Sequence, residues 1–233
     1  MRNLDRIMRR LRKEYRAWTT PKRGRDVCVD LARVLKPAMI FDVGANVGQS
    51  AAKFKKRFPA AHIHCFEPSA ASARRIRARR LGGVEVHEMA LGSVAGTASL
   101  ARGHDPAIFH IAEHGATAGD ETVAIETVDS FCAAGGIDRI DFMKIDTEGH
   151  DLEVLKGAAT MLAAGRIAAV QVEAGMNPEN DFHIPFEALK SFLEASGYRL
   201  FGFYDQVNEW PTKQPHLRRA NPLFVSREIY APA

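Results

Sequence analysis

The sequence predicts an α/β protein whose mostly parallel, seven-stranded sheet is covered by helices on both faces. Short apolar runs of strand length alternate with segments of helical periodicity from about residue 26 onward. The first of these runs leads directly into a glycine-containing turn, which is typical of the start of a strand–turn–helix unit. Strands that alternate with helices usually run parallel, because each helix returns the chain to the same edge of the sheet. The length of 233 residues fits one such domain with additions.

The strands are expected where short runs of apolar residues are bounded by polar or turn-forming residues. In chain order they are 38–43, 62–66, 84–88, 140–145, 168–173, 198–204 and 223–225. Helical spacing of apolar residues predicts helices over 27–35, 47–58, 69–81, 151–164 and 185–195, with Ser69 capping the third. The stretch 95–125 is the least regular, and we expect an insertion there with two short strands around a loop.

The first 25 residues form a separate basic segment ahead of the domain at 26–233. Apolar residues recur at helical spacing over residues 3–18 with arginines between them, which predicts an amphipathic N-terminal helical extension and a linker. Such a helix could pack its apolar stripe on the domain, pair with a second copy of the chain, or contact a membrane surface or nucleic acid. The sequence leaves these alternatives open.

Composition restricts the class and the compartment of the protein. The net charge of +4 comes from the basic N-terminal segment, so the remaining body is slightly acidic. Three scattered cysteines without a CxxC spacing argue against a disulfide framework and against a zinc cluster. No apolar run has the length of a membrane span, and no apolar signal-peptide core follows the basic start. We therefore expect a cytoplasmic protein.

The turn after the first expected strand is the first candidate binding element. In a parallel α/β sheet, ligands bind beyond the carboxyl ends of the strands. The turn begins at Asp42, where Gly44 permits a tight bend, Asn46 tolerates a left-handed backbone and Gly48 allows close approach of a ligand. By itself this pattern also fits an ordinary turn or a cradle for a dinucleotide pyrophosphate.

Acidic residues end the next two expected strands. Glu67, followed by Pro68, can accept hydrogen bonds from both ribose hydroxyls of an adenosine, although it could also simply end a strand in water. Glu88 and Met89 follow the third strand, where Met89 could pack on an adenine ring and Glu88 could accept a hydrogen. Surface exposure is the alternative for Glu88.

A longer motif, Lys144-Ile145-Asp146-Thr147-Glu148-Gly149-His150 followed by Glu153-Val154-Leu155-Lys156-Gly157, gives the strongest signal. Together with the Asp42–Gly48 turn and the Phe66-Glu67-Pro68, Ala90-Leu91-Gly92 and Val128-Asp129-Ser130 segments, it resembles the FkbM-type methyltransferases over roughly residues 38–174. The resemblance implies a Rossmann-like class I methyltransferase fold and S-adenosylmethionine as donor. It also implies O-methylation of a small molecule or glycan, with a sugar, lipid or polyketide-like acceptor.

The resemblance also implies roles for the residues around the cofactor. Gly44 and Gly48 would border the methionine part, with Asn46 at the middle glycine position of the general motif. Asp42 would hold the amino group through water. The adenosine would lie against residues that follow the second and third strands: Glu67 with Pro68 at the ribose, and Glu88 with Met89 at the adenine.

Four side chains are candidates for catalysis, because they lie at or just beyond two adjacent strand ends: Asp146, Glu148, His150 and Glu173. A hydroxyl acceptor must lose a proton, which requires a base or a cation that lowers its pKa. Asp146 is the first choice as base. Asp146 and Glu173 could instead hold a divalent cation, whereas Glu148 and His150 could merely cap a helix. Lys144 could be only the structural ion-pair partner of Asp146.

Two other enzyme classes compete with this interpretation. A strand, a glycine turn and a downstream acid also suit an NAD-dependent oxidoreductase, although the turn lacks GxGxxG spacing. The basic N-terminus motivates a nucleic-acid methyltransferase as the second alternative. Asp146-Thr147-Glu148-Gly149 stands where the motif of base-amine methylation would lie and argues against that chemistry, so the form left open is an RNA ribose 2′-O-methyltransferase, and nucleic acid is the weaker expectation. Four histidines in expected loops are interpreted as surface residues: His104, His110, His114 and His183.

Overall fold

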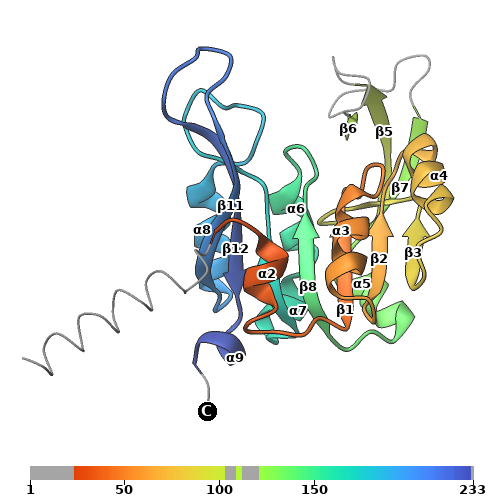
Figure 1. Ribbon diagram of the computed structural model, residues 1–233. Helices are drawn as coiled ribbons and strands as arrows, with labels where there is room; N and C mark the ends of the chain where they lie inside the picture. The colour runs from red at the N-terminus through yellow and green to blue at the C-terminus, as the bar shows by residue number, and fades with distance from the viewer. Residues whose placement is uncertain (1–23, 103–108, 112–120, 232–233) are drawn as a thin grey trace, which may run out of the picture.

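A computed structural model describes residues 24–102, 109–111 and 121–231 of the chain (Figure 1). The predicted N-terminal helix, and with it the proposed boundary after residue 25, falls almost entirely outside these residues and stays a prediction. His104 and His114 also lie outside them. Within the described ranges, no helix is both long enough and apolar enough to cross a membrane.

The main sheet contains all seven predicted strands and one short addition. Its order is β10-β12-β9-β8-β1-β2-β3, with β11 paired to β12. The bounds are β1 Met39–Val43, β2 His62–Phe66, β3 Val84–His87, β8 Ile140–Ile145, β9 Ile167–Gln171, β10 Ala174–Gly175, β11 Arg199–Asn208 and β12 Leu217–Val225. The β10 strand, which has only two residues, is the addition.

The centre of the sheet is parallel and one side is antiparallel. β3, β2, β1, β8 and β9 pair in parallel, whereas β12 runs antiparallel to β9, β10 and β11. The carboxyl ends of β1, β2, β8 and β9 therefore meet at one edge, as the sequence predicts. The hairpin of β11 and β12 is longer than expected.

Two layers of helices cover the sheet (Figure 1). One core cluster packs buried side chains of α2 (Val27–Leu31), α3 (Gln49–Arg57) and α4 (Ala70–Ala78) on one face. The other cluster packs α5 (Val128–Gly135), α6 (Asp151–Lys156), α7 (Ala159–Ala163) and α8 (Phe186–Ala195) on the opposite face. A short α9 (Arg227–Tyr230) ends the described chain.

The helix predicted over 151–164 is divided into α6 and α7 at Gly157. A Cβ atom at Gly157 would lie 2.0 Å from the carbonyl oxygen of Gly92, so only glycine allows this close approach of the two backbones. The cap predicted at Ser69 is confirmed, since its hydroxyl accepts the backbone N–H of Ser72 at 3.5 Å. Two predicted helices end early: α2 at Leu31 and α4 at Ala78.

The irregular stretch forms a second, small sheet rather than two strands around a loop. Its order is β4-β7-β5-β6, with bounds β4 Ala90–Leu91, β5 Gly96–Arg102, β6 Phe109–Ile111 and β7 Glu121–Glu126. The helix α5 follows it and was not expected; Thr127 caps it by accepting the backbone N–H of Ser130 at 3.0 Å. Cys28, Cys65 and Cys132 are all buried and free.

Candidate active site

The turn after β1 has the backbone conformation that its glycines predict. Gly44 has φ +75°, and a Cβ atom there would lie 1.9 Å from the carbonyl oxygen of Asp146. Asn46 has φ +50° and Gly48 has φ +79°, so the expected left-handed backbone is confirmed at Asn46. The backbone of β1 thereby meets the end of β8 without any side chain between them.

Glu67, at the end of β2, holds this turn in place. Its carboxylate accepts the backbone N–H of Asn46 at 2.8 Å and that of Ser69 at 2.9 Å. The carbonyl oxygen of Phe66 accepts the N–H groups of Gly44 and Ala45 at 3.0 and 3.1 Å. The buried Glu67 therefore organises the turn, and a carboxylate oxygen can accept a second hydrogen bond from a ligand hydroxyl.

Asp42 is a completely buried acid in the middle of the site. Neither of its carboxylate oxygens accepts a hydrogen bond of ordinary geometry within the described residues. Burial raises the pKa of Asp42 to about 6, although the nearby Lys144 ammonium opposes the shift. The backbone N–H of Ala51 also opposes the shift, but an ionised carboxylate this deeply buried is still unfavourable, and a cationic group of a ligand would help to satisfy it. The expected role of Asp42, holding the amino group of the cofactor through water, is compatible with this burial and stays a prediction.

Lys144, which is buried, and Asp146, which is half-buried, form an ion pair at the end of β8. The Lys144 ammonium donates to the Asp146 carboxylate at 2.7 Å, as expected for a structural pair. Burial opposes ionisation of both groups, but their mutual attraction prevails. It raises the pKa of Lys144 and lowers the pKa of Asp146. Because a carboxylate with a lowered pKa is a weak base, Asp146 is poorly suited to the role of base that the sequence favoured.

Glu148, Glu173 and His183 come together beside this ion pair. Their candidate ligand atoms all lie within 4.8 Å of one another. The Nε2 atom of His183 lies 3.1 Å from Oε2 of Glu173 and 3.9 Å from Oε2 of Glu148. Arg219 of β12 forms an ion pair with the other oxygen of Glu173, and Asn180 Oδ1 lies 3.0 Å from Nδ1 of His183.

Glu148 combines a strained backbone with an unusual carboxyl group. Its φ of +53° is rare for a residue with a side chain, and such strain is concentrated at functional sites. Burial, followed by repulsion from Glu173 and Asp146, raises the pKa of Glu148 to about 7. A carboxylate with this pKa can take a proton near neutral pH, whereas an ordinary glutamate is a poor base.

Asp151, the first residue of α6, connects the two strand ends that carry these acids. Its carboxylate accepts the backbone N–H of Glu173 at 2.8 Å and the hydroxyl of Thr147 at 2.8 Å. Burial raises its pKa to about 6. Asp151 is 1% exposed, so it positions the loop after β8 and the end of β9 rather than contacting a substrate.

The remaining predicted residues lie near the edges of the site. Glu88 is exposed and paired with Arg77, and Met89 is half-buried against the core. Pro68 is half-buried behind Glu67. His150 precedes α6 as its N-cap residue, but its side chain makes no capping hydrogen bond. The proposed adenine contact of Glu88 and Met89 and the catalytic role of His150 stay predictions.

Two contributors were not anticipated from the sequence. His183 was interpreted as a surface residue, but it is buried at 9% exposure and faces Glu148 and Glu173. Asp151 was treated only as the start of a helix. An acid in the first turn of a helix that follows a strand end is a usable signal for Asp151. The sequence carries no comparable signal for His183, which the segment after β10 brings to the site.

A pocket of about 420 Å³ adjoins the acids on the side of His183. It is lined by the segment from Gly175 to Glu187, including Met176, Asn180, Asp181, His183 and Pro185. A volume of this size suits a small-molecule acceptor or one sugar unit. His183 belongs both to this pocket and to the acid cluster, so it connects the two.

The sequence model of the methyltransferase FkbM domain matches residues 42–200, which is more than half of the chain. The chain belongs to the FkbM methyltransferase family. The matched segment runs from Asp42 through the strand-end acids to β11. S-adenosylmethionine is the methyl donor that this membership implies. The FkbM assignment therefore confirms the predicted family and decides against an oxidoreductase.

Curated relatives of this FkbM chain are similar at low identity. Hexuronic acid methyltransferase AglP of Haloferax volcanii is 28% identical over 145 residues, which cover 61% of this chain and 59% of AglP. The 2-O-methyltransferase NoeI of Sinorhizobium fredii is 25% identical over 175 residues, covering 67% of this chain and 71% of NoeI. The chain thus spans about three fifths of AglP and somewhat more of NoeI.

A crystal structure of methyltransferase FkbM from Methylobacillus flagellatus KT has the same fold. It superimposes with a TM-score of 0.55 at 16% identity, over 82% of this chain and 44% of that one. A likeness at this identity bears on the fold alone. The predicted Rossmann-like class I architecture is confirmed, and the strand order places the turn after β1 beside the end of β8.

Proposed function

We propose that the protein is an O-methyltransferase that transfers the methyl group of S-adenosylmethionine to a hydroxyl of a sugar or glycan. The observation that carries this proposal is the cluster of Glu148, Glu173 and His183 near the Asp42–Gly44 turn, in which burial and neighbouring carboxylates raise the pKa of Glu148 to about 7. A hydroxyl oxygen becomes nucleophilic only as its proton leaves, so such a base is what O-methylation requires. The names of the relatives AglP and NoeI support a sugar acceptor.

The charges of the site favour a cationic cofactor. The site contains more carboxyl groups than cationic side chains. The cations are Lys144 and Arg219, and the five carboxyl groups are those of Asp42, Asp146, Glu148, Asp151 and Glu173. S-adenosylmethionine carries a sulfonium and an ammonium group, and both would be stabilised in this field. We propose that Asp42 faces the ammonium group and that the Glu67 carboxylate accepts the ribose hydroxyls. Glu88 and Met89 would border the adenine.

Different residues of the site would take part in different steps of methyl transfer. The bound cofactor supplies an electrophilic methyl group, and the transfer is an in-line displacement in which alignment provides much of the rate. Glu148 takes the hydroxyl proton as the oxygen–methyl bond forms. His183, oriented through Nδ1 by Asn180, faces the carboxylates of Glu148 and Glu173 and lines the acceptor pocket. Asp146 stays ionised beside Lys144 and keeps the loop after β8 in position.

A divalent cation is the alternative means of activating the hydroxyl. The sequence suggested Asp146 and Glu173 as ligands, and these two side chains lie within hydrogen-bond reach of each other. Glu148, Glu173 and His183 form a second set of possible ligands. Lys144 already neutralises Asp146, and Arg219 already pairs with Glu173. We therefore propose Glu148 as a base without a metal. Transfer that stops on chelation and returns with Mg²⁺ would replace this proposal with the metal-assisted one.

The decisive experiment measures methyl transfer to defined acceptor classes. The purified full-length chain is incubated with S-adenosylmethionine and, separately, with uronic-acid oligosaccharides, neutral oligosaccharides, lipids, polyketides and RNA. Release of S-adenosylhomocysteine is followed, and the methylated atom is located by NMR. We expect transfer to a hydroxyl of one of the saccharide classes. Transfer confined to RNA, or methylation of nitrogen or carbon, would contradict the proposal.

A further inference from the structure

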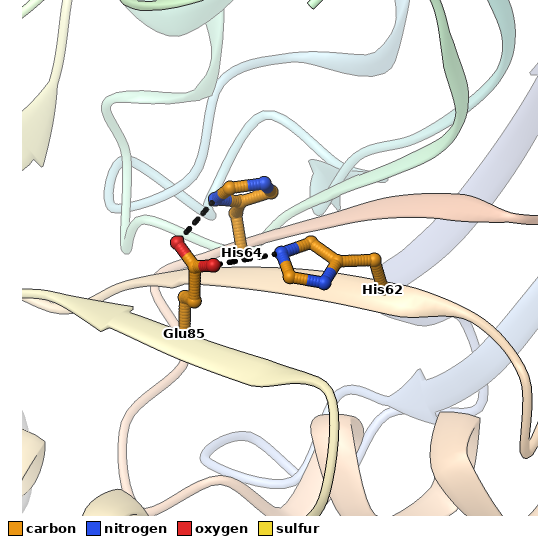
Figure 2. A group of neighbouring side chains, drawn as sticks. All are labelled: His62, His64 and Glu85. Atoms are coloured by element: carbon orange, nitrogen blue, oxygen red, sulfur yellow. Dashed lines mark ion pairs between the residues drawn. The ribbon is translucent and has the colours of Figure 1, made fainter. Parts of the chain in front are cut away.

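A second group of histidines lies outside the acid cluster, on the two neighbouring strands β2 and β3 at the side of the main sheet. His62 and His64 alternate along β2, and Glu85 and His87 alternate along β3. Side chains two residues apart on a strand point to the same face of the sheet. Since His64 pairs with Glu85 and Phe66 with His87 in the parallel register, all four side chains gather on one face. Figure 2 shows His62, His64 and Glu85 of this group pointing toward one another.

The distances within the group are those of metal ligands. Nε2 of His62 lies 3.1 Å from Oε1 of Glu85, and Nδ1 of His64 lies 3.7 Å from Oε2 of Glu85. Nε2 of His87 lies 2.9 Å from Nδ1 of His64 and 4.0 Å from Oε2 of Glu85. Ligand atoms about 2.0 Å from a tetrahedral zinc ion are separated from one another by about 3.3 Å. The observed separations between ligand atoms run from 2.9 to 4.0 Å and so include that value.

Two other groups in the described chain also combine a histidine with two acids: Glu148, Glu173 and His183 in the active site, and Glu179, Glu209 and His216. The partners of Glu85 differ from those of the acids in these groups. Among the ion pairs of the described chain, Glu85 is paired only with imidazoles. Glu173 pairs with Arg219, and Glu209, in the group with Glu179 and His216, pairs with Arg218. A guanidinium already supplies the cation in those two groups. Among the described residues, no lysine or arginine forms an ion pair with Glu85.

The environment of His64 holds its ring in a fixed position. The side chain is 9% exposed. Phe131 of α5 packs edge-on against the rings of His64 and His87 at centroid distances of 5.6 and 4.9 Å. An unprotonated imidazole nitrogen offers a lone pair to a metal ion, and the packing of Phe131 that fixes the ring also fixes the direction of that lone pair.

We propose that His62, His64 and Glu85 form a binding site for a transition-metal ion of the Zn²⁺ type, with His87 as the fourth ligand. Nitrogen ligands with one carboxylate suit Zn²⁺ and disfavour Mg²⁺, which prefers oxygen. The ion would replace the proton that lies between the facing nitrogens of His64 and His87. It would also join β3, the last strand of the sheet, to β2 and so hold the strand end that leads to Glu88 and Met89.

The test is a calorimetric titration of Zn²⁺ into the untagged full-length chain, which is freed of metal by chelation beforehand. Mg²⁺ is titrated in parallel. His62→Ala and Glu85→Gln are the test variants, because these side chains are 38% and 55% exposed and their replacement leaves the core intact. His216→Ala and His183→Ala are the controls, since they disable the other two groups.

We expect saturable Zn²⁺ binding by the wild type and none of comparable strength for Mg²⁺. His62→Ala and Glu85→Gln should each weaken the Zn²⁺ affinity by about tenfold or more, whereas the two controls keep it. Zn²⁺ should also raise the thermal midpoint of the wild type but not that of His62→Ala, because a ligand of the folded state stabilises it. The proposal is overturned if Zn²⁺ does not bind, or if its affinity falls in a control and not in the test variants.

Discussion

The carboxylate of Asp151 accepts the backbone N–H of Glu173 at 2.8 Å, and so the first turn of α6 is joined to the end of β9. The same carboxylate accepts the hydroxyl and the backbone N–H of Thr147 at 2.8 and 3.2 Å. One buried side chain therefore fixes the spacing between the loop that carries Glu148 and the strand end that carries Glu173. The geometry of the acid cluster depends on this contact.

Replacing Asp151 with asparagine should reduce both stability and activity. An amide offers one acceptor oxygen where the carboxylate offers two, so either Thr147 or Glu173 loses its partner. We expect the free energy of unfolding to fall by about 1–3 kcal/mol and kcat to fall as Glu173 shifts. Urea unfolding and steady-state kinetics measure the two effects.

Asp129→Asn is the matched control for that variant. The Asp129 carboxylate likewise accepts two backbone N–H groups, from Thr160 at 2.8 Å and Met161 at 3.0 Å, but it lies at the start of α5. It should lose stability and keep kcat. Equal losses of kcat in the two variants would show that Asp151 acts only through global stability.

Glu148→Gln should remove the proton acceptor while keeping the size of the side chain. We expect kcat to fall by about 10²–10⁴-fold, with little change in affinity for S-adenosylmethionine. In the wild type, kcat/KM should rise with pH through about 7 and then level off, because Glu148 acts as a base only when ionised. The variant should lack this limb of the pH profile. Glu179→Gln, at an exposed acid, is the control; a wild-type profile that is flat between pH 6 and 8 would contradict the assignment.

Gly44→Ala tests the close approach of the cofactor turn to β8. The added Cβ would lie 1.9 Å from the carbonyl oxygen of Asp146, so the turn or the strand end must move and binding of S-adenosylmethionine should be lost. Gly197→Ala is the control, since Gly197 also has a positive φ, +89°, but open space where a Cβ would lie. It should cost only the backbone strain of about 1–2 kcal/mol. Calorimetric binding and thermal unfolding separate the two effects, and cofactor affinity retained in Gly44→Ala would refute the placement.

Asp42→Asn should make the protein more stable and less able to bind its cofactor. The pKa of Asp42 in the folded state, about 6, lies above the ordinary value of 3.8 for an aspartate, so the folded state disfavours the ionised carboxylate. This penalty is fully present above pH 6 and disappears as the pH falls toward 3.8. The gain in unfolding free energy should therefore be larger at pH 7.5 than at pH 5. Affinity for S-adenosylmethionine should fall at pH 7.5, and a variant that binds normally would exclude a contact with the cofactor ammonium.

Much of the cofactor half of the site could be predicted from the sequence because it follows from local rules. Residues that directly follow parallel strands lie at one edge of the sheet, which brings Asp42, Glu67 and Asp146 together whatever the rest of the chain does. The positive φ at Asn46 and the close approach at Gly44 follow from residue type and turn position. The structure confirms these placements, whereas the contacts with the cofactor stay predictions.

The acceptor half depends on contacts between segments that are distant along the chain. The carboxylate that lies beside Lys144 has a lowered pKa and is therefore the weaker base, and this carboxylate is Asp146 rather than Glu148. The alternation of side chains along a strand shows only that Lys144 and Asp146 point to the same side of the sheet. His183 enters the site because Gly149 packs against Phe182: a Cβ at Gly149 would lie 2.6 Å from the carbonyl oxygen of Phe182. No local pattern encodes that contact.

The sequence by itself thus determined the α/β class, the seven principal strands, the family and the turn at Gly44, because hydrophobic periodicity and backbone conformational limits act over a few residues. Only the tertiary structure decided the pKa of Glu148, the position of His183 beside Glu148 and the hydrogen bond from Glu173 to Asp151. It also decided that His62, His64 and Glu85 lie together on one face of the sheet. Burial and the distance between charges set these properties, and both arise only once separate strands and loops have packed together.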